Sequence, residues 1–101
     1  MSKLSYIRRR YLIAYDIVDD KKRTKIFEIC SEEGNRIQYS VFIVELNEME
    51  LIKLKGKINS IINSKTDQVL FVDLGVAKSG GVGIIFAVGR RYEPQVRTIV
   101  I

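Results

Sequence analysis

The alternation of short apolar runs with segments of helical periodicity is the strongest constraint on the fold of this chain. Residues 11–16 (YLIAYD) and 68–74 (QVLFVDL) are rich in β-branched and aromatic side chains, which is typical of buried strands. A helical segment follows the first run, and another helical segment precedes the second run. This order predicts an α+β domain in which one sheet carries the helices on one face.

The first helical segment begins within an acidic stretch. Either Asp19 or Asp20 can cap it, because a carboxylate accepts hydrogen bonds from the free N–H groups of a first turn. The segment runs to about Glu33, where Gly34 is expected to stop it. The apolar residues of its inner face are Ile26, Ile29 and Cys30.

The second helical segment opens with a capping box. Asn47 and Glu50 have the required spacing, with Asn in place of the usual Ser or Thr. The segment continues to about Asn63, and Gly56 in its interior costs about 1 kcal/mol relative to Ala. The apolar residues at helical spacing are Leu51, Leu54, Ile58 and Ile61.

Residues 36–46 (RIQYSVFIVEL) lie between the two helical segments and alternate in polarity. As one strand they would be about 36 Å long, at about 3.3 Å per residue, which exceeds the usual strand length. A ferredoxin-like plait, with the order βαββαβ, needs two strands here. The segment is therefore either one long strand or two strands joined by a bend near residues 38–40. The residues expected on one side are Ile37, Tyr39, Val41 and Ile43.

The C-terminal part supplies more apolar sequence than the core of one chain needs. Residues 84–88 (IIFAV) predict an extra strand, and 96–101 (VRTIVI) form a last apolar segment. Such strands can pair with an exposed sheet edge, including the edge of a second copy. We expect residues 1–101 to form one domain, with a basic arm at 1–10 and strands within 84–101 that pair in a homodimer. The aromatic residues assigned to the core are Phe71 and Phe86.

Composition restricts the setting and the chemistry. Hydrophobic residues make up 47% of the chain and charged residues 29%, which favours a globular fold. The single cysteine cannot form an internal disulfide, no secretory signal is visible, and no apolar run is long enough to span a bilayer. We therefore expect a cytoplasmic protein without a membrane partner. The absence of histidine excludes Ser-His triads and His-ligated zinc.

Basic residues gather in three clusters, and the net charge is +5. Each cluster could be a solvated face, but together they favour a polyanion such as nucleic acid. The candidate nucleic-acid-binding residues are Arg8, Arg9, Arg10, Lys21, Lys22 and Arg23, with Lys25 beside them and Arg90, Arg91 and Arg97 in the third cluster.

Asp16 ends an apolar run, directly before the first helical segment. It can be a turn residue that accepts backbone N–H groups, whereas Asp19 and Asp20 are better explained as caps. Three acids within five residues also suit a hard cation such as Mg²⁺. If two copies meet near Asp16, the two carboxylates repel each other, and a shared proton or a metal relieves the repulsion.

Three stretches, in order, resemble the CRISPR-associated Cas-two family, whose members partner the Cas-one integrase in spacer acquisition. They are YLIAYDIVDDKKR (11–23), RIQYSVFIVEL (36–46) and DQVLFVDLG (67–75). The shared pattern is a strand with Tyr-Asp-Ile, an Arg on the first helix, Arg-x-Gln-x-Ser-Val-Phe and a closing strand. It covers nearly the whole chain.

The resemblance implies a ferredoxin-like homodimer in which the C-terminal strand of each chain completes the partner's sheet. It implies that Asp16 of both chains holds a divalent metal, Mg²⁺ or Mn²⁺, for phosphodiester hydrolysis. Tyr15 and Phe42 would shape the dimer cleft, Arg23 and Arg36 would hold phosphate, and Ser40 would hydrogen-bond near the metal. The candidate catalytic residues are therefore Asp16, Tyr15, Arg23, Arg36 and Phe42. Core packing of Tyr15 and Phe42 is the structural alternative.

The chain departs from the family pattern at three places. Residues 2–10 (SKLSYIRRR) precede the first strand, which in the family comes almost at the start. Ile43 stands where an acid is common, with Glu45 two residues further on, and Lys25 replaces a second arginine of some relatives.

Several functions fit this sequence. The first is a dimeric, metal-dependent endonuclease that cuts RNA or DNA in CRISPR-based antiviral defence. The second is a scaffold that clamps duplex DNA and bridges Cas-one integrase dimers, with Asp16 only structural. An RNA-recognition motif fits less well, since RIQYSVFIV lacks the small residues of its signature stretch. A toxin-like ribonuclease of the same fold is a further alternative.

Overall fold

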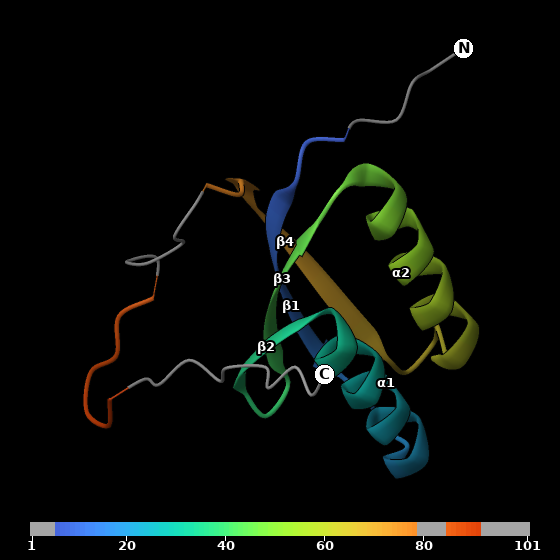
Figure 1. The fold of residues 1–101 in the computed structure, drawn as a ribbon. Coiled ribbons are helices and arrows are strands. Elements are labelled where there is room, and N and C mark those ends of the chain that lie inside the picture. Colours follow the sequence, from blue (N-terminus) through green and yellow to red (C-terminus); the bar gives the residue numbers. More distant parts are fainter. Residues whose placement is uncertain (1–5, 79–84, 92–101) are drawn as a thin grey trace, which may run out of the picture.

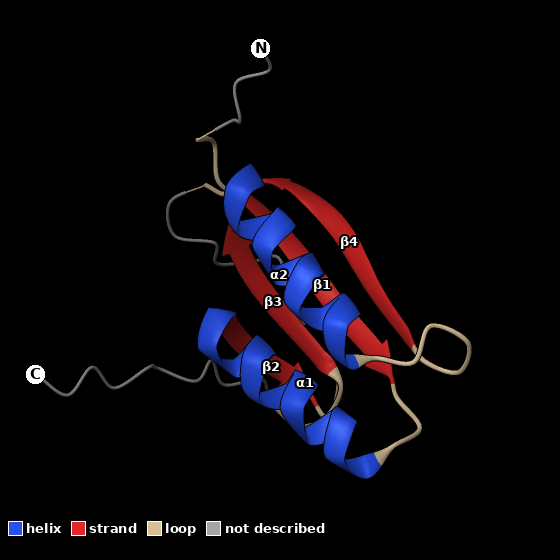
Figure 2. Cartoon of the chain, turned by 90° about the vertical axis from the view of Figure 1, so that its right-hand side faces the viewer, coloured by secondary structure: helices blue, strands red, loops and turns tan. Residues whose placement is uncertain are grey.

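Two helices cover one face of a four-stranded antiparallel sheet in the computed structural model, which describes residues 6–78 and 85–91 (Figure 1; Figure 2). The elements are β1 (Arg9–Asp16), α1 (Asp20–Glu33), β2 (Gly34–Gln38), β3 (Val41–Leu46), α2 (Glu48–Ile61) and β4 (Gln68–Val76). The strand order in the sheet is β2-β3-β1-β4. This arrangement confirms the predicted α+β plait with the order βαββαβ.

The core lies between the sheet and the two helices. Alternate residues of β1 point to opposite faces, so Tyr11, Ile13 and Tyr15 are buried under the helices. The helices and β3 complete the core with Ile26, Cys30, Phe42, Val44, Leu46, Leu54 and Ile58. Among the described residues, no helix lies on the other face of the sheet (Figure 2).

Both helices begin where the sequence predicts. The Asp19 carboxylate accepts a hydrogen bond from the Lys22 backbone N–H at 2.9 Å, so Asp19 is the N-cap of α1. Asn47 and Glu50 form the predicted capping box, with both hydrogen bonds at 2.9 Å. Helix α2 ends at Ile61, two residues before the expected end. Neither helix is long and apolar enough to cross a membrane, within the residues that the structure describes.

Gly34 stops α1 for a reason other than left-handed backbone. Its φ of −166° is extended and accessible to any residue. A Cβ at this position would instead lie 2.2 Å from the carbonyl oxygen of Ile43. Only glycine allows β2 to approach β3 so closely directly after the helix.

Residues 36–46 form parts of two strands, which settles the alternative that the sequence leaves open. β2 and β3 are joined by a turn at Tyr39 and Ser40. The predicted alternation is wrong at Tyr39, because this turn residue is 85% exposed and belongs to neither strand. Val41 and Ile43 do share a face of β3, as expected.

The predicted strand at 84–88 is not found within its described part. Residues 85–88 are not strand, and they run apart from the sheet in Figure 1. Phe86 was expected in the core and is 87% exposed, because the side chains under the two helices already fill the inner face of the sheet. Phe71, by contrast, packs against the core as predicted. Residues 1–5, 79–84 and 92–101, including the expected apolar segment at 96–101, lie outside the described residues.

Two glycines should respond to alanine in opposite ways. In Gly56→Ala the new methyl group meets no atom within 4 Å, so the gain in helix propensity should raise the free energy of unfolding by about 1 kcal/mol. In Gly34→Ala the clash with Ile43 should lower it by about 1–3 kcal/mol. Urea unfolding at one fixed protein concentration measures both, with each variant as the control for the other. Two shifts of the same sign would contradict this account.

Candidate functional site

Asp16 lies at the end of β1 on the open face of the sheet. Its side chain is exposed, and its backbone pairs with Gln68 of β4. No hydrogen bond or ion pair of the Asp16 carboxylate is found within residues 6–78 and 85–91. The carboxylate is therefore available to a ligand, and the alternative of a turn residue held by backbone N–H groups is not what the structure shows.

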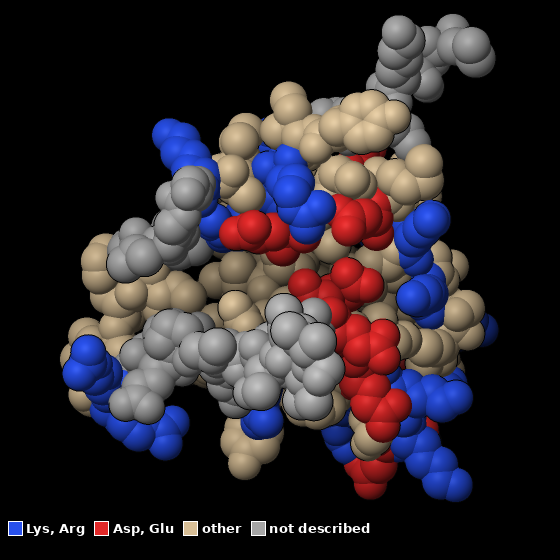
Figure 3. Space-filling view, viewed as in Figure 1, with Lys and Arg blue, Asp and Glu red and all other residues tan. Residues whose placement is uncertain are grey.

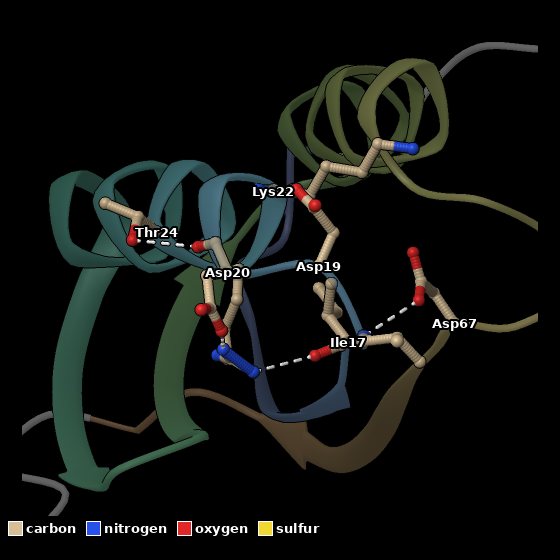
Figure 4. A network of polar contacts seen from close by, with 8 residues as sticks. Ile17, Asp19, Asp20, Lys22, Thr24 and Asp67 are labelled. Carbon is tan, nitrogen blue, oxygen red and sulfur yellow. Dashed lines mark hydrogen bonds and ion pairs between the residues drawn. The ribbon is translucent and has the colours of Figure 1, made fainter.

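The neighbouring acids are occupied by structural contacts (Figure 4). Asp19 caps α1, and Asp20 forms an ion pair with Arg23 in the first turn of the same helix. Asp67 accepts hydrogen bonds from the backbone N–H groups of Val18, at 3.1 Å, and Asn63, at 2.8 Å. Asp67 therefore ties the loop after β1 to the loop before β4.

Residues 6–78 and 85–91 of one chain do not supply a complete metal site. Among the described residues there is no group of three or more His, Cys, Asp or Glu side chains that could hold a metal ion. The three acids between Asp16 and Asp20 are close in sequence but have separate roles, so they do not form the cation site that their spacing suggests. A single unpaired carboxylate fits a metal that is shared with another carboxylate from outside the chain.

Arg23 is fixed near the end of β1. One guanidinium nitrogen donates to the carbonyl of Ile17 at 3.1 Å, and another contacts Asp20. Thr24 donates its hydroxyl to the carbonyl of Asp20 at 3.0 Å, which continues the same network (Figure 4). The predicted phosphate-binding position of Arg23 is therefore built from the first turn of α1 and the strand before it.

Tyr15 and Phe42 are buried on the helix side of the sheet, as the core-packing alternative predicts. Their rings stack at 6.3 Å between centroids, and Phe27 meets Phe42 edge-on at 5.8 Å. The Tyr15 hydroxyl donates to the carbonyl of Tyr39 at 3.4 Å. Burial raises the pKa of Tyr15, although the positive charges of Arg36 and Arg23 act in the opposite direction. The expected role of Tyr15 and Phe42 in a dimer cleft stays a prediction.

Arg36 lies on β2, shortly before the β2–β3 turn at Tyr39 and Ser40, and its guanidinium lies over two aromatic rings. Its guanidinium carbon is 5.3 Å from the centroid of Phe27 and 4.8 Å from that of Tyr39. Ser40, in the same turn, accepts a hydrogen bond from the Tyr15 backbone N–H at 3.1 Å through its carbonyl. The expected hydrogen bond of Ser40 near a metal stays a prediction.

The candidate residues thus divide between the two faces of the sheet. Tyr15 and Asp16 are consecutive strand residues, so their side chains point to opposite faces. Phe42 and Arg36 lie on the side of Tyr15, whereas Asp16 lies alone on the open face. Within one chain, the structure does not bring these residues together at one point.

The first basic cluster is largely neutralised by acids. Arg9 and Arg10 belong to β1, so the basic arm expected over residues 1–10 is shorter than the sequence suggests. The ion pairs of the cluster are Arg8–Glu50 at 2.7 Å, Arg9–Asp73 at 3.1 Å and Arg10–Glu45 at 2.8 Å. Red and blue groups accordingly adjoin on the face in Figure 3. Nucleic-acid binding by these three residues stays a prediction.

Sequence reasoning missed Asp67, Phe27 and Tyr39. A signal for Asp67 existed, since an acid directly before a strand often satisfies backbone N–H groups in the preceding loop. Tyr39 also carried a signal, because a large aromatic residue in a two-residue turn has no core to enter. The contact between Phe27 and Arg36 joins α1 to β2, and no local pattern reveals it.

Comparison with known proteins identifies the family of this chain. The family model for CRISPR associated protein Cas2, the Cas-two family named above, matches residues 9–80. The match spans every strand and helix of the sheet domain, from the first residue of β1 to beyond the end of β4. The chain therefore belongs to the CRISPR-associated Cas2 family.

Similar proteins support this assignment. The "CRISPR-associated endoribonuclease Cas2" of Geobacter sulfurreducens is 32% identical over 91 residues, which cover 90% of this chain and 95% of that protein. The "CRISPR-associated endoribonuclease Cas2 4" of Rhodospirillum rubrum is 40% identical over 60 residues, 59% of this chain and 48% of that protein, so the match spans about half of its length. The crystal structure of a hypothetical protein from Thermus thermophilus has a TM-score of 0.72 and 27% identity, and the match covers 87% of this chain and 99% of that one.

Asp67 should make the stability of the fold depend on acid pH. Its hydrogen bonds with Asn63 and Val18 hold the pKa of its carboxyl below the usual 3.8. The folded state therefore gains stability from the ionised group above that value and loses it as the pH falls through the lower folded pKa. Asp67→Asn keeps only one acceptor oxygen and should be less stable than the parent chain at pH 7.

This difference should narrow as the pH falls below 3.8, because the unfolded parent chain then binds a proton at this carboxyl more readily than the folded chain does. Urea unfolding at pH 7 and pH 3, at one protein concentration, measures it. Glu28→Gln removes another exposed carboxylate and serves as the control, with no such change expected. A deficit of Asp67→Asn that is equal at both pH values would contradict the assigned role of the ionised group.

Proposed function

We propose that this protein is a metal-dependent endonuclease that hydrolyses phosphodiester bonds of RNA or DNA as a homodimer, in CRISPR spacer acquisition and antiviral defence. The observation that carries the proposal is the exposed, unpaired carboxylate of Asp16 at the end of the central strand β1. The names of two relatives from Geobacter sulfurreducens and Rhodospirillum rubrum, each a CRISPR-associated endoribonuclease, support the same reaction class.

A second copy of the chain is the proposed cover for the open face of the sheet. On β4, Leu70, Val72 and Leu74 lie on this face and are each 45–48% exposed. This apolar surface continues on β1 through Leu12 and Ala14 and on β3 through Val41 and Ile43. Leu12 is paired with Ile43 and with Val72, and Ala14 is paired with Val41 and with Leu70. Burial of such an apolar surface is favourable. The identical surface of a second copy can bury it about a two-fold axis.

The proposed dimer also explains why one chain holds a single ligand. Asp16 lies on the face that the second copy would cover, so two copies bring two carboxylates towards each other. Mutual repulsion of these carboxylates favours a divalent cation between them, and oxygen ligands suit Mg²⁺ or Mn²⁺. A bound divalent cation would supply Lewis-acid polarisation of the phosphodiester and a water with a lowered pKa.

The other candidate residues would position the substrate. Arg23 is anchored by Ile17 and Asp20 near the end of β1, where its remaining N–H groups can hold a phosphate oxygen. The exposed Lys21 and the half-buried Lys22 lie beside it on the first turn of α1. Arg36 of β2 would hold another phosphate from the helix side. Tyr15 fixes the adjacent β2–β3 turn through the carbonyl of Tyr39, whose ring contacts Arg36.

Asp16→Asn should abolish cleavage without unfolding the chain. The substitution keeps the size of the side chain but removes the charge that a cation needs, and Asp16 makes no contact to lose within the described residues. End-labelled single-stranded RNA and duplex DNA are incubated with Mg²⁺, with Mn²⁺ and with EDTA. We expect cleavage by the parent chain only with metal, and a loss of at least a hundredfold in the variant.

The control is Glu28→Gln, which removes an exposed carboxylate of α1 and should cut like the parent. Cleavage that survives in Asp16→Asn would show that Asp16 is not the metal ligand. No cleavage by the parent, with binding to duplex DNA retained, would contradict the hydrolytic proposal.

Val72→Lys should prevent dimer formation. It places a charge in the middle of the apolar face, where burial in a dimer would leave it unpaired. Sedimentation velocity should show a monomer, and metal-dependent cleavage should be lost with the dimer. The matched control is Ile52→Lys on α2, which is 55% exposed in the chain and lies on the helix side. A Val72→Lys variant that remains a dimer would exclude this face as the interface.

A scaffold that clamps duplex DNA and bridges dimers of the Cas-one integrase is the second candidate. It is favoured by the absence of a three-ligand metal group among the described residues and by the exposed lysines on α1. Contacts of this kind go to phosphates, so they give binding that weakens steeply with salt and does not need Asp16. The cleavage experiment above separates the two functions.

A further inference from the structure

Tyr39 is a large aromatic residue without a core position. It forms the β2–β3 turn with Ser40, where small and polar residues are common, and 85% of its surface is exposed. Its backbone carbonyl is held by the Tyr15 hydroxyl at 3.4 Å, so the turn itself is tied to the core. The ring thus projects from a fixed support into solvent.

Arg36 gives this ring a defined orientation and a nearby charge. Its guanidinium carbon is 4.8 Å from the Tyr39 centroid and 5.3 Å from the Phe27 centroid, so the guanidinium contacts both rings. Phe27 packs edge-on against Phe42, which is fully buried. A continuous set of contacts therefore runs from the core through Phe27 and Arg36 to Tyr39.

The charge of Arg36 is not neutralised by an ion pair within the part of the chain that the structure describes. Arg8, Arg9, Arg10 and Arg23 each form an ion pair with a carboxylate, whereas no carboxylate lies within ion-pair distance of Arg36 in residues 6–78 and 85–91. A guanidinium that is positioned by aromatic contacts alone keeps its N–H groups for an anion, and its planar edge matches phosphate oxygens.

We propose that Tyr39 and Arg36 together bind one unpaired nucleotide, with the base stacked on the solvent side of the Tyr39 ring and the phosphate on the Arg36 guanidinium. This inference rests on the proposed function for the nature of the ligand, which is a nucleic acid. Aromatic stacking on bases combined with a cation for the backbone is how proteins hold single strands with little sequence preference.

The site selects single-stranded substrate on physical grounds. Both faces of a base inside a duplex are covered by its neighbours, so Tyr39 can stack only on an unpaired or terminal base. Phosphate contacts by Lys21 and Lys22 carry no such requirement, because single strands and duplexes both expose their phosphates. Loss of Tyr39 should therefore weaken the binding of single strands selectively.

The experiment compares Tyr39→Ala, Tyr39→Trp and Tyr6→Ala with the parent chain. Tyr6 is 91% exposed and therefore gives a matched loss of an exposed tyrosine away from the turn. Fluorescence anisotropy measures the Kd for a labelled single-stranded RNA and for a duplex DNA of equal length, in EDTA so that nothing is cut. Quenching of a 2-aminopurine base in the single strand reports stacking directly.

We expect Tyr39→Ala to raise the Kd for single-stranded RNA by about 5- to 100-fold, as loss of one stacked base does, and to abolish the quenching. Tyr39→Trp should retain the affinity for single-stranded RNA and the quenching, and Tyr6→Ala should match the parent. The affinity for duplex DNA should be unchanged in all of these variants. Arg36→Lys keeps a charge but loses the planar fork, so it should weaken binding of the single strand as well.

Equal affinities of Tyr39→Ala and the parent for single-stranded RNA would overturn the inference, and so would an equal loss for duplex and single strand. The nuclease proposal is tested separately, because the anisotropy assay needs no cleavage. An uncut substrate or an active Asp16→Asn variant would contradict the nuclease proposal. A parent chain that binds no single strand at all would contradict the Tyr39 site directly, whatever it does to duplex DNA.

Discussion

The structure depends on a sheet that, in residues 6–78 and 85–91, has helices on one face only. Both helices pack on the face of β1 that carries Ile13 and Tyr15, and their buried residues fill that side. The other face remains apolar, with β4 residues that are nearly half-exposed. Neither helix covers this apolar surface, and a second copy of the chain is the cover that we propose for it.

The same constraint separates charge from aromatic packing at the end of β1. The strand period of two places Tyr15 in the core and Asp16 on the open face, so a shift of one residue in register would exchange them. Cations on the helix side, Arg23 and Arg36, are held by a carbonyl, an acid and aromatic rings. In the proposed function, the nucleic acid is held from the helix side and is cut at the open face, where Asp16 lies and which the second copy would cover.

Local signals in the sequence predict most of the fold. The caps at Asp19 and Asn47 and the buried faces of both helices follow from short-range hydrogen bonds and periodicity, and both are confirmed. Local patterns do not predict contacts between residues that are distant in the sequence. The three ion pairs of Arg8–Arg10 are of this kind, because they join residues at least 35 positions apart. Phe86 was assigned to the core from its apolar neighbours alone, although that core was already complete. The Asp16 site needs a second chain, which one sequence read alone does not place.

The most direct test of the central claim asks whether two Asp16 positions meet in solution. Asp16→Cys is treated with a short bismaleimide, with Ile52→Cys on α2 as the control. Burial, with a smaller contribution from Glu33, raises the pKa of the native Cys30 thiol to about 12, so it should stay unreactive. The account predicts a cross-linked dimer for position 16 and none for position 52. A chain that sediments as a dimer but forms no cross-link at position 16 would contradict it.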